Sequence, residues 1–381
     1  MINTDIPYDF RSILSEFGID SSTCRVIPFG SGHINSTYLV KDNRLDKPGY
    51  LLQRINDHVF KDVPLLMENI RLVIGHVQEK LQQIPGSDPE KEVLTLLPTI
   101  HSHYYFKDDL DNYWRVYLYM EGTKSYDLTK TKHQAYEGGK AFGKFQALLI
   151  DLDPTCLAEI IPSFHNIEQR LNRLNLALNI NFDNRVKDCI AEITFIYEIR
   201  ASMGKILAMG RENRLPLRVT HNDAKFNNVL LDRNDNAQCV IDLDTVMPGF
   251  VAYDFGDAIR TIINTSAEDE GDLEKIQLNI GLYKAYTRGY MEKTISFLTD
   301  DEIESLIYGV LLLPYMQAVR FLTDFIEGDH YFKIQFHDHN LQRARAQLQL
   351  LRKIRECQEL LTDIIYKTAA RSKAAYQLNL L

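Results

Sequence analysis

The chain has 381 residues, of which 45% are hydrophobic and 25% charged, the composition of a globular protein long enough for two domains. Its 43 basic and 52 acidic residues give a formal charge of −9. Nucleic-acid binding depends on Lys and Arg neutralising phosphates, so this acidic balance argues against DNA or RNA as the main partner. It does not exclude one bound nucleotide, because a local cluster of cations can offset the global sign.

From the sequence we expect neither a secretory signal nor a membrane-spanning segment. The five cysteines are scattered without a C-x-x-C pair, which indicates buried thiols in a reducing compartment. The N-terminal residues have neither the basic start nor the apolar stretch of a secretory signal. The longest apolar run, residues 306–319, is interrupted by Gly309, Pro314 and Gln317, and we expect it not to cross a membrane. The sequence therefore predicts a soluble, cytoplasmic protein without a membrane partner, and it leaves the oligomeric state open.

The first 120 residues are predicted to be mostly β structure. Apolar patterns typical of strands cover residues 26–29, 37–40 and 50–55. Helical spacing of apolar residues follows at 64–81, and two more strands are expected at 93–100 and 113–120.

Helical periodicity dominates the chain after Gly122. The helices are expected at residues 136–149, 167–178, 186–209, 273–290, 301–325 and 341–368. One predicted hairpin, 229–241, interrupts them. We therefore predict an α+β protein with a small β-rich lobe, residues 1–121, and a larger helical lobe, residues 122–381.

The most informative stretch is His-Asn-Asp-Ala-Lys-Phe-Asn-Asn at residues 221–228, followed by Ile-Asp-Leu-Asp at 241–244. Phosphoryl transfer needs positioning, charge neutralisation and a group that orients the nucleophile. Asp223 can accept the proton of an attacking hydroxyl, and Asn228 and Asp242 offer the oxygen ligands that Mg²⁺ prefers. Asp and Asn before a strand are often only turn residues. Here the hairpin returns the second carboxylate to the same point, which favours a phosphoryl-transfer centre.

This pattern resembles the catalytic loop of protein kinases, and more closely that of the aminoglycoside and choline kinase superfamily. The β-rich lobe, the hinge and the helical lobe follow in the matching order, so the resemblance covers most of the chain. It implies a protein-kinase-like bilobal fold that binds ATP and Mg²⁺ between its lobes. Residues 29–35, 52–56, 221–228 and 240–260 are similar to the N-acetylhexosamine 1-kinases. That similarity implies phosphorylation of the anomeric hydroxyl of GlcNAc, GalNAc or a close analogue.

The glycine-containing stretch Gly30, Ser31 and Gly32 lies between two predicted strands. Glycines there let backbone N–H groups approach phosphates. The sequence departs from the kinase pattern at Asn35, which stands where a third glycine is expected, so the loop could instead contact the sugar.

Other nucleotide contacts are implied by the resemblance. Arg54 stands where protein kinases keep a lysine for the α- and β-phosphates, and Glu68 on the following helix would hold it. An exposed strand arginine is the alternative. A shift of register by one residue would exchange Arg54 with Gln53. The adenine is expected against the hinge, residues 119–122, which includes Glu121.

The resemblance also gives roles to residues around the catalytic motif. Lys225 would neutralise the transferring phosphoryl group, with a solvated loop lysine as the alternative. Asp244 follows Asp242 at strand alternation, so that both could approach the metal. Asp254 is expected to be an N-terminal helix cap and to support the catalytic loop without taking part in the chemistry.

Three residues are expected near the acceptor: His33, Arg320 and Tyr331. The alternatives are a solvated loop histidine for His33 and a salt bridge from Arg320 to Asp324 four residues on. The remaining histidines fit turns or the surface, and no G-x-S-x-G motif of a serine hydrolase is present.

Several rival functions stay open at this stage. A kinase of the same fold could act on choline, homoserine or an aminoglycoside, and a cationic substrate would need an acidic or aromatic cage. A nucleotide-binding pseudokinase is a rival of a different class. A protein kinase is disfavoured because no segment resembles an activation segment ending in Ala-Pro-Glu.

Overall fold

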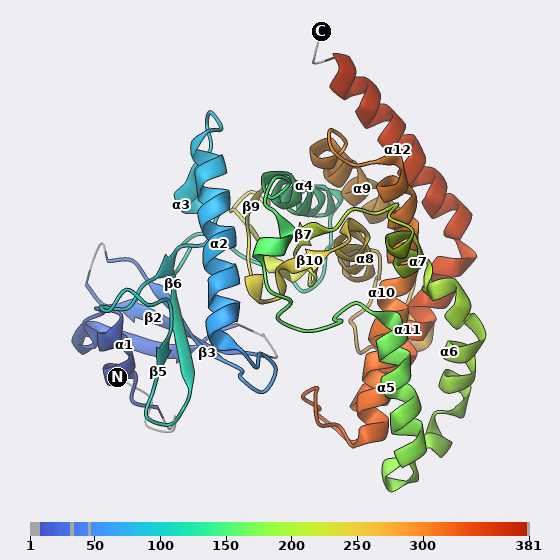
Figure 1. Ribbon diagram of the computed structural model, residues 1–381, viewed down its shortest axis with the longest axis horizontal. Helices are drawn as coiled ribbons and strands as arrows, with labels where there is room; N and C mark the ends of the chain where they lie inside the picture. The colour runs from blue at the N-terminus through green and yellow to red at the C-terminus, as the bar shows by residue number, and fades with distance from the viewer. Residues whose placement is uncertain (1–7, 31–33, 45–46, 379–381) are drawn as a thin grey trace.

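The protein has an antiparallel sheet at one end and a helical body at the other (Figure 1). The computed structural model describes residues 8–30, 34–44 and 47–378. The predicted α+β class is confirmed. The last strand of the sheet ends at Leu118 and the first helix of the helical body begins at Lys132. The division of the chain at residue 121 lies between these points and stays a prediction.

The N-terminal lobe is built on one sheet in the spatial order β1-β2-β3-β6-β4, with β5 also paired to β6. All of these pairs are antiparallel. The strands are β1 (Cys24–Pro28), β2 (Ser36–Asp42), β3 (Tyr50–Ile55), β4 (Leu96–Leu97), β5 (Phe106–Lys107) and β6 (Tyr113–Leu118). The helices are α1 (Phe10–Glu16), α2 (Val63–Gln82) and α3 (Pro89–Glu92).

The two faces of this sheet have different partners. Successive residues of a strand point to opposite faces, and β3 pairs with β6 so that Gln53 lies opposite Arg115 and Arg54 lies opposite Trp114. Trp114 belongs to a small outer core with Phe10 of α1. Gln53 and Arg115 therefore lie on the other face, toward α2 and the helical lobe.

The helical lobe surrounds two short strand pairs. Its strands are β7 (Arg218–Thr220), β8 (Val229–Leu231), β9 (Ala237–Val240) and β10 (Met247–Gly249), paired β7 with β10 and β8 with β9. Its helices are α4 (Lys132–Leu148), α5 (Ile167–Ile180), α6 (Ile190–Met203), α7 (Lys205–Arg211), α8 (Val251–Ile262), α9 (Ile280–Thr294), α10 (Asp300–Glu327), α11 (His339–Glu356) and α12 (Gln358–Leu378).

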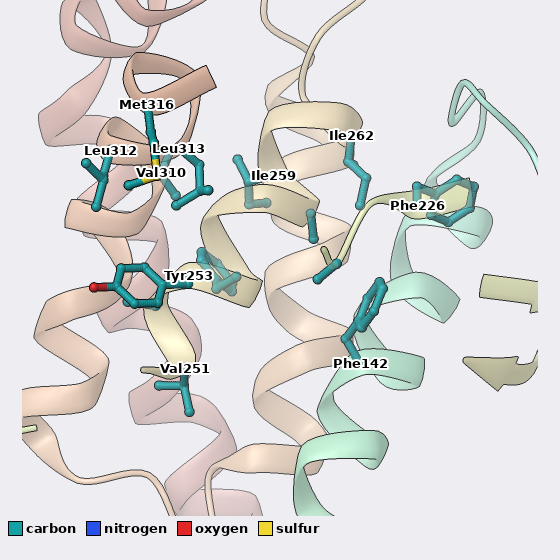
Figure 2. Close-up of a cluster of buried hydrophobic side chains, with 14 of the residues drawn as sticks. Phe142, Phe226, Val251, Tyr253, Ile259, Ile262, Val310, Leu312, Leu313 and Met316 are labelled. Atoms are coloured by element: carbon teal, nitrogen blue, oxygen red, sulfur yellow. The ribbon is translucent and has the colours of Figure 1, made fainter. Parts of the chain in front are cut away.

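Helix α8 lies in the centre of the helical core and packs against α10 (Figure 2). Ile259 of α8 and Leu313 of α10 are among the buried side chains of this contact. The two backbones approach closely at Gly256 and Gly309, where a Cβ on Gly309 would collide with the carbonyl of Ala252. This close packing fixes α8, which carries Asp254, relative to the rest of the lobe.

Helix α10 is the one described helix that is long and apolar enough to cross a membrane by length and composition. The protein buries 83% of its most apolar window, as expected of an interior helix. Its start is fixed by a capping box, in which Thr299 accepts a hydrogen bond from Glu302 N–H and Glu302 accepts one from Thr299 N–H. Pro314 lies inside it and is buried.

Most predicted elements are confirmed, and the differences have local causes. The strand predicted at 93–100 is only two residues long and ends before Pro98, which has no N–H for a ladder. The helix predicted at 186–209 is divided at Gly204, and the helix predicted at 341–368 is divided at Cys357. Helix α9 begins only at Ile280. Helix α1 was not predicted.

Candidate active site

A cleft of about 440 Å³ is lined by residues from both lobes. It brings together most of the residues that the sequence motifs singled out. Those lining it are Gly30, Asp223, Lys225, Asn228, Asp242, Asp244, Arg320 and Tyr331.

The loop after β7, which carries the predicted catalytic motif, is held in place by Asp254, a fully buried residue of α8. Its carboxylate accepts hydrogen bonds from the backbone N–H of His221 at 2.9 Å and of Asn222 at 2.7 Å. Gln146 of α4 donates to the same carboxylate at 2.9 Å. The supporting role predicted for Asp254 is therefore consistent with its contacts, although it lies inside the helix and is not its cap.

The loop is also tied to the segment that follows β9. His221 donates from Nε2 to the carbonyl of Ile241 at 2.9 Å, and Thr245 donates to the carbonyl of His221 at 2.8 Å. Asn222 has a positive φ of 62°, and its side chain donates to three backbone carbonyls, among them that of Thr245. Asp223 and Asp242 are thus held by one hydrogen-bonded network, as the two motifs predicted.

Asp223 lies between a cation and an amide. The ammonium of Lys225 is 3.1 Å from its Oδ2. Asn228 donates from Nδ2 to the Asp223 carbonyl at 2.8 Å and to Oδ2 at 3.3 Å. Burial acts to raise the pKa of Asp223, but the charge and hydrogen bond of Lys225 outweigh it and the net shift of this pKa is downward. Asp223 is therefore ionised at neutral pH and able to accept a proton.

Within the described residues, the carboxylate of Asp242 forms no ion pair, whereas its neighbours Asp223 and Asp244 each pair with a cation. Burial, with the nearby carboxylates of Asp244 and Asp223, raises the pKa of Asp242 to about 6. Among the described residues no group of three His, Cys, Asp or Glu side chains could hold a metal by itself. Mg²⁺ usually keeps several waters and binds through one or two protein oxygens together with phosphates. Asp242 and the amide oxygen of Asn228, whose nitrogen is committed to Asp223, fit that kind of site.

Asp244, in contrast, is already paired. It is 3% exposed, and the guanidinium of Arg115, 1% exposed, donates to both of its oxygens, with Nη2 and Oδ2 2.9 Å apart. Asn35 donates to the same Oδ2 at 2.6 Å. These contacts do not fit the metal-ligand role that strand alternation predicted, because both oxygens face donors of the N-terminal lobe.

The predicted pair of Arg54 and Glu68 is wrong. Arg54 lies on the outer face of the sheet, where it donates to Asn112 at 2.9 Å. Glu68 is about half exposed and pairs with Arg71 on its own helix. The alternation of side chains along β3 places Gln53, and not Arg54, toward the cleft.

The other residues predicted to contact the nucleotide lie only partly in the cleft. Gly30 lines the cleft with a φ of 80°, a conformation that favours glycine. Glu121 is exposed and does not line the cleft, whereas the hinge residues Tyr119 and Met120 before it do. Ser31, Gly32 and His33 lie outside the described residues, so their predicted roles stay predictions.

Where the acceptor is predicted to bind, Arg320 is surrounded by aromatic rings. Its guanidinium carbon lies 5.3 Å from the ring centroids of Phe164 and Phe332 and 5.8 Å from that of Tyr331. It donates to Gln317 at 2.9 Å. The alternative of a salt bridge to Asp324 is not found, because that carboxylate accepts backbone N–H groups, among them those of residues 330–332. The structure thus brings Arg320 and Tyr331 together in the cleft.

Cations predominate on this side of the cleft. Arg320, Lys333 and Arg343 line it, and within the described residues none of them is ion-paired with a carboxylate. The two acids nearby, Asp257 and Glu268, both pair with Arg260. This side of the cleft is therefore not an acidic cage.

A buried histidine also lines this part of the cleft. His165 packs between Phe164 and Tyr253 and donates from Nε2 to the carbonyl of Asn222 at 2.9 Å. Burial lowers the pKa of His165 to about 3, so the ring is neutral and its Nδ1, which has no partner within the described residues, is an acceptor. The expectation that the remaining histidines lie in turns or at the surface is wrong for this one, and also for His339, which is buried at the start of α11.

Comparison with known proteins agrees with this geometry. A model of the phosphotransferase enzyme family (APH) matches residues 25–290. The chain belongs to this family. Among solved structures, choline kinase from Cryptosporidium parvum Iowa II matches with a TM-score of 0.56 at 16% identity, over 91% of this chain and 95% of that chain.

Two further structures have the same fold. A microcompartment-associated aminopropanol kinase matches with a TM-score of 0.57 at 15% identity, over 91% of this chain and 97% of the other. The phosphotransferase APH(2″)-IIa, solved as a ternary complex with streptomycin and ATP, matches with a TM-score of 0.54 at 14% identity, over 92% and 97%. At these identities the likeness shows a shared kinase-like fold, as predicted.

Sequence reasoning missed that Arg115 and Asn35 of this phosphotransferase both donate hydrogen bonds to Asp244. A charged residue in the middle of the apolar strand Tyr-Trp-Arg-Val-Tyr-Leu was a usable signal, because a buried arginine needs a partner. Nothing in the sequence indicated that this partner is Asp244, because Asp244 lies 129 residues after Arg115. His165 carried no signal, since a single histidine before a helix is common.

Proposed function

We propose that the protein transfers the γ-phosphoryl group of Mg·ATP to the anomeric hydroxyl of an N-acetylhexosamine, GlcNAc, GalNAc or a close analogue. The products are a sugar 1-phosphate and ADP. Membership of the phosphotransferase family supports the reaction type, and the similarity of four sequence stretches to N-acetylhexosamine 1-kinases supports the acceptor.

One observation carries the choice of a neutral sugar over a cationic alcohol. The aromatic rings that could hold an ammonium group already surround the guanidinium of Arg320. A choline-like cation would have to displace this cation or lie beside it, at a large electrostatic cost. A sugar, in contrast, offers oxygens to the donors Arg320 and Lys333, which line the cleft.

The residues of the chain have separate tasks in the proposed reaction. Asp223 accepts the proton of the acceptor hydroxyl, and Lys225, 3.1 Å from it, keeps it ionised and stabilises the charge that develops. Asn228 and Asp242 would hold Mg²⁺, which when bound neutralises the phosphates. Asp254 keeps the loop in the geometry that in-line transfer requires.

The experiment is an ADP-release assay with Mg·ATP and a panel of acceptors. The panel contains GlcNAc, GalNAc, their alditols, plain hexoses, choline, homoserine and an aminoglycoside. Turnover of the N-acetyl sugars and its loss in the alditols would support anomeric phosphorylation. Preferential turnover of choline or an aminoglycoside would refute the sugar assignment. Binding of ATP with no turnover of any acceptor would favour the pseudokinase.

The assignment of the base needs its own variant. Asp223→Asn is expected to lower kcat by about three orders of magnitude and to leave KM for ATP close to that of the wild type. Asp363→Asn on α12, whose carboxylate makes only an exposed pair with Lys367, is the matched control. Near-normal turnover of Asp223→Asn would show that another group accepts the proton.

A further inference from the structure

A partly buried cluster of polar side chains connects the sheet of the N-terminal lobe to the segment of the helical lobe that carries Asp242. We call it the Arg115 junction, and it consists of Arg115, Asp244, Asn35 and Gln53. Arg115 donates from Nε to Gln53 at 2.9 Å and from both terminal nitrogens to Asp244. Gln53 in turn donates to Thr37 of β2 at 3.0 Å. Three neighbouring strands of the sheet are thereby connected to one carboxylate of the helical lobe.

Asn35 connects a second part of the N-terminal lobe to the same carboxylate. It directly precedes β2, donates to Asp244 at 2.6 Å and accepts the backbone N–H of Asn56 at 3.0 Å. Asn56 donates back to the carbonyl of Ile34 at 3.3 Å. The connection between β1 and β2 therefore has its β2 end fixed relative to Asp244.

Stability alone does not explain why the junction contains a buried ion pair. A buried ion pair stabilises a fold no more than well-packed apolar residues of the same volume do, and often less. Its location gives a reason for its presence: Asp244 lies two residues after Asp242, and Arg115, Asn35 and Asp242 all line the cleft. Among the described residues before the hinge, Arg115 is the only Lys or Arg that does so.

We propose that the Arg115 junction positions the phosphate-binding part of the nucleotide site. It holds the sheet and Asp242 in a fixed mutual geometry, so that the phosphates of the nucleotide contact both at once. Strand β6 thus supplies a positioning cation near the phosphates, whereas the sequence had predicted a phosphate-binding cation on β3, at Arg54. The inference rests on the proposed use of ATP, and it assigns Arg115, Asp244 and Asn35 as positioning residues.

The test measures the affinity for adenosine, AMP, ADP and ATP, the last two with and without Mg²⁺, by calorimetry without an acceptor sugar. Because the junction acts on phosphates, Arg115→Met is expected to bind ADP and ATP at least about tenfold more weakly and adenosine as the wild type does. Arg115→Lys, which keeps the charge but not the forked geometry, should fall between the two. Arg25→Met, an exposed arginine on β1, is the matched control.

A double variant separates positioning from stability. Removing one partner of a buried pair leaves an unpaired charge, so each single variant is expected to lower the melting temperature. Arg115→Met combined with Asp244→Leu replaces the pair by apolar residues and should recover most of that loss. If this stable double variant still binds ATP weakly and adenosine normally, the proposal is supported.

Two results would overturn the inference. One is recovery of ATP affinity in the double variant together with its stability. The other is a loss of affinity that is equal for adenosine and ATP, which would mean that the junction only maintains the shape of the cleft. A wild-type protein that binds none of the four compounds would instead refute the kinase proposal itself. Failure of the sugar panel alone would leave the inference intact.

Discussion

Asp254→Asn is the sharpest test of how the fold positions the catalytic loop. The carboxylate accepts three hydrogen bonds, from His221 N–H, Asn222 N–H and Gln146 Nε2. An amide can accept on only one of its two heavy atoms. We expect its NH₂ to replace Oδ1, which serves Asn222 alone, because replacing Oδ2 would leave both other donors without an acceptor. Gln146 cannot turn to compensate, since its Oε1 accepts from Tyr290 at 2.6 Å.

The expected loss of stability in Asp254→Asn follows from the number of hydrogen bonds that the amide cannot form. One hydrogen bond to a charged group is lost and one buried N–H is left unpaired, at about 2–4 kcal/mol together. Burial raises the pKa of Asp254, so the neutral amide recovers part of this by removing a buried charge. We expect a loss of about 2 kcal/mol in the free energy of unfolding. Because Asn222 adjoins Asp223, a displaced loop should also lower kcat by about 10- to 100-fold.

The assay combines urea unfolding with steady-state turnover of the best acceptor from the panel. Asp363→Asn, the same chemical change on the surface, should alter neither quantity, since exposed pairs contribute little. An unchanged kcat in Asp254→Asn would contradict the reasoning, because it would mean that the loop keeps its position without the carboxylate. A lower stability with a normal kcat would limit Asp254 to a structural role.

Three further predictions concern pH and packing. Burial raises the pKa of Asp242 to about 6, and Mg²⁺ binds the ionised form, so the apparent affinity for Mg²⁺ should fall below pH 6. Calorimetry from pH 5 to 8 measures this affinity, and a profile that does not change with pH would contradict the prediction. Burial lowers the pKa of His165 to about 3, so stability is fully present above the unfolded value near 6.5 and is lost as the pH falls. His165→Gln keeps the donor to Asn222 and serves as the reference. Between pH 6 and 4.5 the wild type should lose about 1.4 kcal/mol more of its free energy of unfolding per pH unit than this variant does, as measured by urea titrations. Equal pH dependence of the two free energies would refute the prediction. Gly309→Ala should lower the free energy of unfolding by about 1–3 kcal/mol, because the added methyl group would collide with the carbonyl of Ala252. An unaltered unfolding midpoint in urea would contradict this, because it would mean that α8 and α10 can move apart at no energetic cost.

Part of the site was predictable because it is local. Asp223, Lys225 and Asn228 lie within six residues, and the hairpin after them returns Asp242 with no long-range information. Helix α2 was predictable because its apolar spacing is regular over five turns and Asp62 caps its start. The strand at 93–100 was not, because buried apolar residues in a short run can also belong to an irregular segment.

The sequence by itself determined the family, the α+β class and the loop in which Asp223, Lys225 and Asn228 lie close together, since each depends on residue types at fixed local spacing. Tertiary structure decided which face of β3 meets the cleft, because a shift of one residue exchanges Gln53 with Arg54 and both fit the same strand pattern. It also decided the partner of Asp244. Arg115 and Asp244 come from different lobes, and an ion pair between them exists only once the packed sheet and the helical core bring two buried charges together.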